Sequence, residues 1–321
     1  MAETGSSLLP DPPVRRTGTR QNGTVVVTAL VPGSTQKVWT SLTDRERVSQ
    51  WFGDLTEPLR SGGTSRLEFG DGDFFEITDI ALHSQHGLSY TWRFLGTGPR
   101  NLISWSIGPR ETGCEVTVTD QEPQRSEAEA AELAKGWIDF VERLQRYVAD
   151  GRRSRYFWRQ EFDGSAELSV DAETGFAALL SPEGQRGWLP WSAPVTASGS
   201  SITIDDGLQP ERFEIAGVRQ EKPGVLQLQL ACTAWRHPTE CRIAIQDRAD
   251  GALLVVSHTG WDGISEEEGE QRRQRRRFGQ FWTGALRRAP ALAGRSRLTA
   301  AQAPEGLRKS GSKNISVVEG R

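Results

Sequence analysis

The sequence predicts an α+β protein of two tandem domains, each an antiparallel sheet covered by one long C-terminal helix. One order of elements runs twice along the 321 residues: an apolar strand, short helices, a Trp-bearing break, a strand series and a final helix. Such a period indicates a tandem duplication. Apolar and polar residues alternate in both strand series, which is typical of strands with one buried face. Each half is long enough to bury its own core.

The first domain is expected over residues 22–149. An apolar, β-rich run leads to Ser34, which is placed to cap a helix. Thr43, with Glu46 three residues later, predicts a capping box for a second short helix. Five strand-like runs and a helix with apolar residues at three- and four-residue spacing follow. The expected strands are 24–31, 64–69, 73–82, 87–95, 100–108 and 113–120, and the long helix is 126–148.

The second domain is expected over residues 157–292, after a linker in which Gly151 predicts a helix stop. Its elements are less regular, and a Trp-rich break separates the first helix from the later strands. Pro, Gly, Ser and Thr enrichment predicts a flexible arm at 1–21, and the polar end predicts a disordered tail at 293–321. The expected strands are 158–169, 200–206, 211–218, 224–235, 239–247 and 251–259, the helices are 171–180 and 265–289, and the break is 181–192.

Composition excludes several classes of protein. A net charge of −3 does not favour nucleic acid or an anionic membrane as a partner. No apolar run reaches the ~18–20 residues that cross a bilayer, and the first residues lack the features of a signal peptide, so a cytoplasmic location is expected. The three cysteines and four histidines have no metal-ligand spacing, and no phosphate-binding glycine motif occurs. We therefore expect no metal and no cofactor.

Short aromatic motifs in both halves resemble those of one known superfamily. They are Val38-Trp39, Leu42-Thr43-Asp44, Gln50-Trp51-Phe52-Gly53, Leu88-Ser89-Tyr90-Thr91-Trp92, Gly136-Trp137, Ser257-His258-Thr259-Gly260-Trp261 and Trp282. The chain resembles the SRPBCC (START-like) superfamily, and within it the domain of the activators of heat-shock-protein ATPase (Aha-type). The resemblance implies tandem helix-grip domains, in each of which a curved antiparallel sheet wraps around the long C-terminal helix and leaves a cavity between them.

Eleven Trp residues against three Tyr residues suggest a cavity for a flat or polycyclic ligand, because Trp offers a large apolar area and one hydrogen-bond donor. The alternative is an ordinary aromatic core. We expect the pocket in the first domain, and we expect Trp137 and Trp282 to face the sheets from the two final helices. The candidate ligand-binding residues are Trp39, Trp51, Tyr90, Trp92, Trp105, Trp137, Trp261 and Trp282.

Catalysis in such a cavity would need side chains that move protons. Asp79 would point into the pocket if Phe75 and Ile77 face the helix, and Glu76 would do so in the other strand register. The remaining candidates are Tyr90 and His258, which closely precedes Trp261-Asp262. The alternatives are solvated carboxylates and a hydrogen-bonded histidine at a strand end.

Four functions fit these observations. The favoured one is binding of a hydrophobic or polycyclic small molecule, in secondary metabolism or in self-resistance. A cofactor-independent cyclase or dehydratase is the enzymatic alternative. A co-chaperone-like regulator of a heat-shock ATPase would have a chaperone as its protein partner, and a regulatory domain without chemistry is the fourth. The fold does not choose among them.

Overall fold

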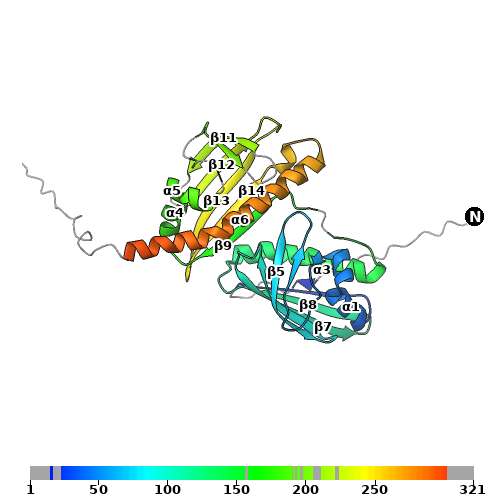
Figure 1. Cartoon of the computed structure of the whole chain (residues 1–321). Helices are drawn as coiled ribbons and strands as arrows, with labels where there is room; N and C mark the ends of the chain where they lie inside the picture. The colour runs from blue at the N-terminus through cyan, green and yellow to red at the C-terminus, as the bar shows by residue number, and fades with distance from the viewer. Residues whose placement is uncertain are drawn as a thin grey trace, which may run out of the picture.

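The computed structural model describes residues 15–16, 23–155, 158–189, 191, 194–195, 198–204, 211–220 and 224–301. They form two domains, each an antiparallel sheet with a long helix lying along it (Figure 1). The fold is α+β with tandem helix-grip domains, as predicted. None of the described helices is long and apolar enough to span a bilayer.

The first domain has an eight-stranded sheet in the order β1-β2-β8-β7-β6-β5-β4-β3. Its helices are α1 (Thr35–Thr43), α2 (Arg45–Trp51) and α3 (Glu127–Asp150). Its strands are β1 (Arg15–Arg16), β2 (Thr24–Val31), β3 (Asp54–Leu55), β4 (Ser65–Glu68), β5 (Phe74–His83), β6 (Gly87–Phe94), β7 (Arg100–Arg110) and β8 (Gly113–Gln121).

Local sequence explains how these helices begin and end. The Ser34 side chain caps α1, as expected. The second helix is capped by Asp44, whose Oδ1 accepts from the Arg47 backbone N–H at 3.0 Å, and not by Thr43. The Thr43 hydroxyl is already used, because it donates to the Trp39 carbonyl one turn earlier at 2.8 Å. Helix α3 ends at Gly151, whose φ of 76° is the left-handed conformation that glycine adopts without strain.

The second domain has a six-stranded sheet in the order β10-β11-β12-β13-β14-β9, with α6 lying along it (Figure 1). The strands are β9 (Phe162–Leu168), β10 (Ser201–Ile204), β11 (Glu211–Gln220), β12 (Val225–Ala231), β13 (Thr239–Arg248) and β14 (Gly251–Thr259). The helices are α4 (Ala172–Leu180), α5 (Pro182–Trp188), the short 3-10 helix η1 (Trp261–Gly263) and α6 (Glu268–Ala301).

Two expected boundaries differ from the structure. The Trp-rich break contains α5, because Ser181 caps it through the Gly184 N–H and Pro182 occupies its first position. Helix α6 continues past residue 292 into the expected tail, and Ala293 is fully buried in the core of the second domain. Residues 302–321 lie outside the described residues. So does the expected arm, apart from Arg15–Arg16, which pairs with β2.

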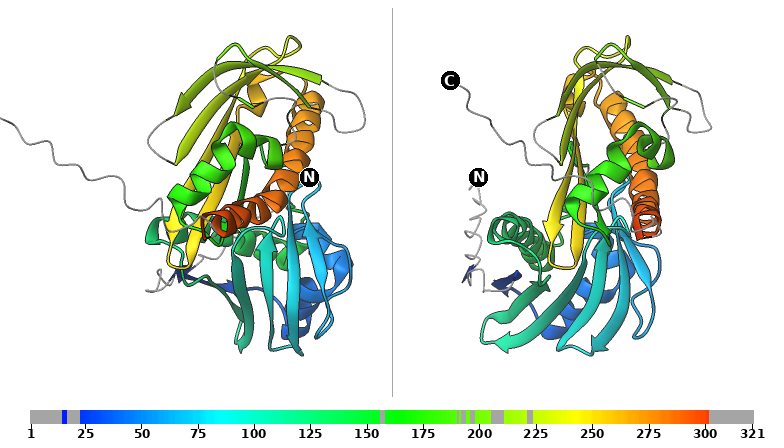
Figure 2. Two further views of the ribbon diagram at one scale, coloured as in Figure 1. Left: turned by 60° about the vertical axis from the view of Figure 1, so that its left-hand side comes forward. Right: turned by 90° about the vertical axis from the view of Figure 1, so that its left-hand side faces the viewer.

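The two domains share a packed interface. Phe74 and Leu95 of the first domain belong to the apolar core of the second. The first two-thirds of α6 faces the first domain through Arg275 and Arg287, and Figure 2 gives two further views of how the domains pack. Ion pairs join the domains at Arg275–Asp73 (2.7 Å), Arg248–Glu129 (2.7 Å), Arg93–Glu167 (3.5 Å) and Arg287–Glu76 (3.8 Å). The interface therefore fixes one domain against the other and places side chains from both around shared cavities.

Candidate functional site

The predicted pocket residues of the first domain form a packed aromatic cluster. The Trp92 and Trp137 rings stack with centroids 5.0 Å apart, and Trp105 meets Trp137 edge-on at 5.6 Å. The Trp105 indole N–H donates to the Tyr90 hydroxyl at 3.2 Å. The cavity beside them is about 20 Å³, which is room for one water. In this structure the space between sheet and helix is thus filled by the protein's own rings.

The other aromatic candidates are also core residues. Trp39 is half-buried against the first core, and Trp51 is fully buried with its N–H donating to the Ser41 carbonyl at 2.9 Å. Trp261 and Trp282 are fully buried in the second domain. The expectation that Trp137 and Trp282 face the sheets is confirmed, because both are buried and their indole N–H groups donate to Asp120 on β8 and to His258 on β14.

A buried polar cluster lies under Trp137. The Asp120 carboxylate, fully buried on β8, accepts the Trp137 indole N–H at 2.9 Å. It also accepts Arg125 at 2.7 Å and the Asn101 side-chain amide at 3.1 Å. A buried carboxylate costs much free energy unless it is paired and hydrogen-bonded, and these partners satisfy it. The cluster fixes the ring of Trp137 and forms a polar base for the adjacent cavity.

That adjacent cavity, the interdomain pocket, has a volume of about 310 Å³. The first domain supplies an aromatic wall from β5 and β6, a polar base, and two residues of α3. The second domain closes it with residues of β9, β13 and β14. The lining residues are Phe75, Trp92, Phe94, Pro99, Asn101, Glu122, Arg125, Glu129, Leu133, Arg159, Ser165, Arg248 and Leu253.

The aromatic wall of the interdomain pocket carries an unused hydrogen-bond donor. Phe75 and Trp92 stack at 3.9 Å with ring planes 12° apart. The Trp92 indole N–H is buried and has no hydrogen-bond partner among the described residues. An unpaired buried donor costs about 1–3 kcal/mol, which an acceptor on a bound molecule would recover. Of the predicted ligand-binding residues, Trp92 is therefore the one that the structure places on an open cavity with unmet bonding capacity.

The structure corrects the prediction that Asp79 or Glu76 faces the cavity. Strand register shifts between Thr78 and Ala81, and this bulge gives Asp79 a φ of 53° and turns it to solvent. Ile80 takes the buried place instead. Glu76 lies on the opposite face of β5 from buried Ile77, within 3.8 Å of Arg287 on α6. Neither carboxylate reaches the aromatic cluster.

His258 and Tyr90 are buried structural groups. The His258 Nδ1 accepts the Trp282 indole N–H at 3.0 Å, so the ring proton sits on Nε2 and is donated to the Thr239 hydroxyl at 2.8 Å. Burial, with the Arg275 charge nearby, lowers the pKa of His258 to about 3. Burial also raises the pKa of Tyr90. Both groups are therefore neutral at physiological pH, and the four catalytic candidates do not meet in one site.

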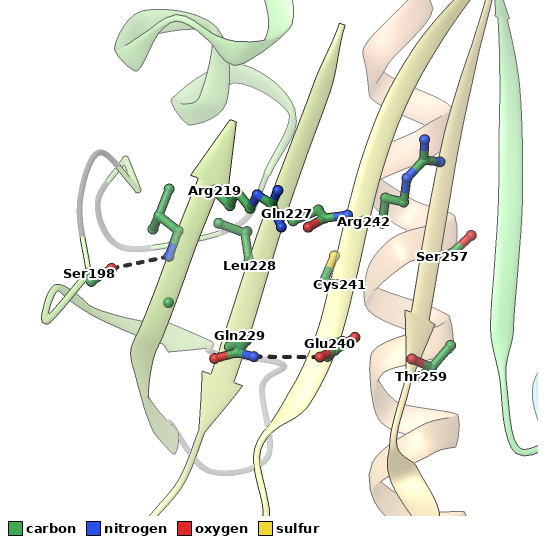
Figure 3. Close-up of a pocket in the computed structure, with 12 residues that line it drawn as sticks. Ser198, Arg219, Gln227, Leu228, Gln229, Glu240, Cys241, Arg242, Ser257 and Thr259 are labelled. Carbon is green, nitrogen blue, oxygen red and sulfur yellow. Dashed lines mark hydrogen bonds between the residues drawn. The ribbon is translucent and has the colours of Figure 1, made fainter. Parts of the chain in front are cut away.

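A second cavity, of about 530 Å³, lies on the face of the second sheet away from α6 (Figure 3). Cross-strand neighbours form its polar floor, with Gln227 beside Arg242 and Gln229 beside Glu240. Gln229 and Glu240 share a weak 3.5 Å hydrogen bond. Apolar and polar residues alternate along β12, which predicts that the face bearing Gln227 and Gln229 is solvated. Most residues that line this cavity are indeed polar or charged. It offers a flat apolar ligand less contact than the interdomain pocket does.

Sequence reasoning did not identify most of the interdomain pocket. Asn101, Glu122 and Arg125 carry no motif, and Ser165 and Leu253 reach the pocket only because the second domain docks on the first. One signal was present, since Asp120 occupies an inward position of the alternating strand β8. A carboxylate in an apolar register indicates a buried partner, here Arg125.

Comparisons with known proteins place the chain in a family. Residues 33–149 match the model of the "Activator of Hsp90 ATPase homolog 1-like protein" family. The crystal structure of DynU16, a protein in the dynemicin biosynthetic locus, is 34% identical with a TM-score of 0.77, over 84% of this chain and 99% of that one.

Other solved structures are more distant. CalU16 from Micromonospora echinospora is 19% identical (TM-score 0.34; 40% of this chain, 76% of that one). The di-domain ARO/CYC StfQ of the steffimycin pathway is 14% identical (TM-score 0.35; 85% and 99%). Curated proteins gave no match. The identity to DynU16 over almost that whole protein shows that the chain belongs to its family, built of tandem SRPBCC domains of the heat-shock-ATPase-activator type.

Proposed function

We propose that this protein binds a flat, hydrophobic small molecule in the interdomain pocket. The observation that carries the proposal is the stacked Phe75–Trp92 wall with a buried indole N–H that has no partner among the described residues. A planar apolar ligand would lie against this wall, and it would accept a hydrogen bond from Trp92 once a neighbouring side chain moves aside from the buried N–H. The volume of about 310 Å³ lies at the lower end of the range for ligand pockets.

The polar side of the pocket would fix the orientation of such a ligand. Arg248 is held by Glu129 at 2.7 Å, and Arg125 by Asp120 at 2.7 Å, so neither guanidinium needs to reorganise when a ligand arrives. Fixed polar groups beside an apolar wall are the usual composition of a specific small-molecule site. A polycyclic ligand with a carbonyl or hydroxyl at one edge would place its rings on the apolar wall and its polar edge beside the two arginines.

The family relationship supports a role in secondary metabolism. DynU16 is a protein in the dynemicin biosynthetic locus, so the ligand proposed here is an intermediate or product of a biosynthetic pathway. Sequestering a toxic product would make the protein a self-resistance factor. Binding is favoured over cyclase or dehydratase chemistry because Glu76, Asp79, Tyr90 and His258 are dispersed, and two of them are buried and neutral.

Native mass spectrometry of freshly purified protein would detect a retained ligand, and fluorescence titration with a neutral polycyclic quinone would test the site. Trp92→Phe keeps an aromatic ring but removes the N–H, so the dissociation constant should rise about 5- to 10-fold for one lost hydrogen bond. Trp191→Phe is the matched control, because Trp191 also has a buried, unpartnered indole N–H but lies in the second core. Equal affinity of both variants and the wild type would refute the site.

A further inference from the structure

A strongly basic cleft lies at the junction of α2, α3 and the linker, and the proposed function does not use it. We call it the arginine cleft. Its volume is about 850 Å³, and five arginines and one aspartate supply its charges. The lining residues are Ser49, Phe69, Gly70, Asp139, Arg143, Arg146, Arg152, Arg153, Ser154, Arg155 and Trp158.

The positive charge of the arginine cleft exceeds the carboxylates that neutralise it. Arg143 pairs with Asp139 at 2.8 Å, Arg152 with Asp150 at 3.0 Å, and Arg155 with Asp54 at 2.6 Å. The other two, Arg146 and Arg153, have no ion pair with a carboxylate among the described residues; Arg146 donates only to the Glu142 backbone carbonyl, at 3.2 Å. This excess is local, because the whole chain has a net charge of −3.

Part of the cleft is already rigid. The side chain of Arg143 is 16% exposed and also donates to the Ser154 carbonyl, and that of Arg155 is 26% exposed and donates to the Glu68 carbonyl at 3.4 Å. The Ser154 backbone N–H in turn donates to the Gln50 carbonyl at 3.1 Å. The linker is thus fastened to the first domain, and the guanidinium groups of Arg143 and Arg155 are held in place before any ligand binds, which reduces the entropy lost on binding.

The cleft also has an apolar wall. The Trp158 indole N–H donates to Glu268 at 2.9 Å, and Arg272 lies 5.6 Å from its ring centroid, so this ring is held against the start of α6. Phe69 lines the cleft as well and belongs to the apolar core of the first domain. Guanidinium groups match phosphate oxygens in paired hydrogen bonds, and indole rings contact flat apolar groups.

We infer that the arginine cleft is a binding site for a phosphorylated organic ligand, a phosphate ester whose anionic end meets Arg146 and Arg153 and whose apolar part contacts Trp158. It is separate from the interdomain pocket. The two share no lining residue: on α3 the pocket reaches Leu133 and the cleft begins at Asp139, six residues on, which is about 9 Å along the helix.

Calorimetric titration of the full chain at pH 8 with 1-naphthyl phosphate, pyrophosphate and neutral 1-naphthol tests this inference. Naphthyl phosphate should bind, and raising the salt from 50 to 200 mM should weaken it, because exposed charges are screened. Arg146→Gln/Arg153→Gln should raise its dissociation constant at least 10-fold. Arg110→Gln/Arg186→Gln removes two charges from side chains that are 53% and 60% exposed elsewhere, and should change it less than 2-fold.

Trp158→Leu should weaken naphthyl phosphate but leave pyrophosphate unchanged, which separates the apolar wall from the charges. The inference is overturned if neither anion binds below 1 mM, or if the Arg146/Arg153 double variant binds naphthyl phosphate like the wild type. Trp92→Phe should have no effect on the pyrophosphate titration, so failure here and failure of the interdomain pocket are distinguishable.

Discussion

Replacing Asp73 by Asn should loosen the docking of the two domains. Arg275 on α6 is fully buried and makes a bidentate ion pair with Asp73, the residue that precedes β5. Its two terminal nitrogens donate to the two carboxylate oxygens of Asp73 at 2.8 and 2.7 Å. It also donates to the Glu161 carbonyl at 2.7 Å, and lies 5.5 Å from the centroid of the Phe162 ring. The guanidinium therefore links three segments that are far apart in the sequence, and water cannot reach it.

The expected magnitude follows from this burial. Removing one partner of a buried ion pair leaves the other charge without compensation in a medium of low polarity, which costs about 3–5 kcal/mol. Asp73→Asn keeps the shape of the side chain, so the decrease in the free energy of unfolding comes from the lost charge and not from altered packing. Urea unfolding followed by Trp fluorescence would measure it, and small-angle scattering would show whether the domains move apart before they unfold.

A double variant supplies the control. Asp73→Leu/Arg275→Met removes both charges and should recover most of the lost stability, since an apolar pair of similar volume can replace a buried ion pair at little cost. A loss below about 1 kcal/mol for Asp73→Asn, or no recovery in the double variant, would refute the view that this pair fastens the domains.

Three further predictions follow from burial and from the linker. Trp137→Ala and Trp282→Ala should each destabilise the protein by about 3–5 kcal/mol in urea unfolding, and a loss under about 1 kcal/mol would contradict the helix registers. The pKa of His258 falls from 6.5 in a free side chain to about 3 on burial, so its contribution to stability is present above pH 6.5. That contribution should be lost as the pH falls towards 3, by at most about 1.4 kcal/mol per pH unit, and His258→Gln should flatten this slope. Limited proteolysis near Arg152–Arg155 should be slow, because Ser154 and Arg155 hold the linker against the first domain and the two domains share a packed interface, whereas rapid cleavage there into two folded pieces would contradict this rigidity.

Much of the fold could be predicted because its signals are local. Cys114, Val116 and Val118 alternate with polar residues and lie buried on β8, as a strand with one apolar face requires. Gly151 ends α3 as expected. The Asp79 prediction was wrong because a bulge depends on how two strands pair, and the alternation within one strand does not show it.

The candidate site is formed by contacts between residues that are far apart in the sequence, and the spacing of apolar residues along one strand or helix does not predict such contacts. The arginine-rich segment 272–277 of α6 is typical of a solvated face or of internal ion pairs, and Arg275 makes such a pair with Asp73, about 200 positions away and across a domain boundary. Because the second domain packs against the first, Leu253 of β14 lines the same pocket as Trp92. The number of Trp residues suggested a ligand cavity, with an ordinary aromatic core as the alternative, and composition alone does not distinguish a filled core from an open cavity.

Because both domains line the interdomain pocket, ligand binding and domain docking are linked. A ligand that binds only the docked form stabilises that form by about 2.7 kcal/mol at 100 times its dissociation constant, which is close to the loss expected for Asp73→Asn. The quinone ligand should therefore restore most of the variant's stability, and the variant should bind it more weakly than the wild type does. A pocket confined to the first domain would bind the variant and the wild type with equal affinity, because Ser165 and Leu253 would then contribute nothing. The Asp73→Asn variant thus tests whether the second domain is part of the binding site.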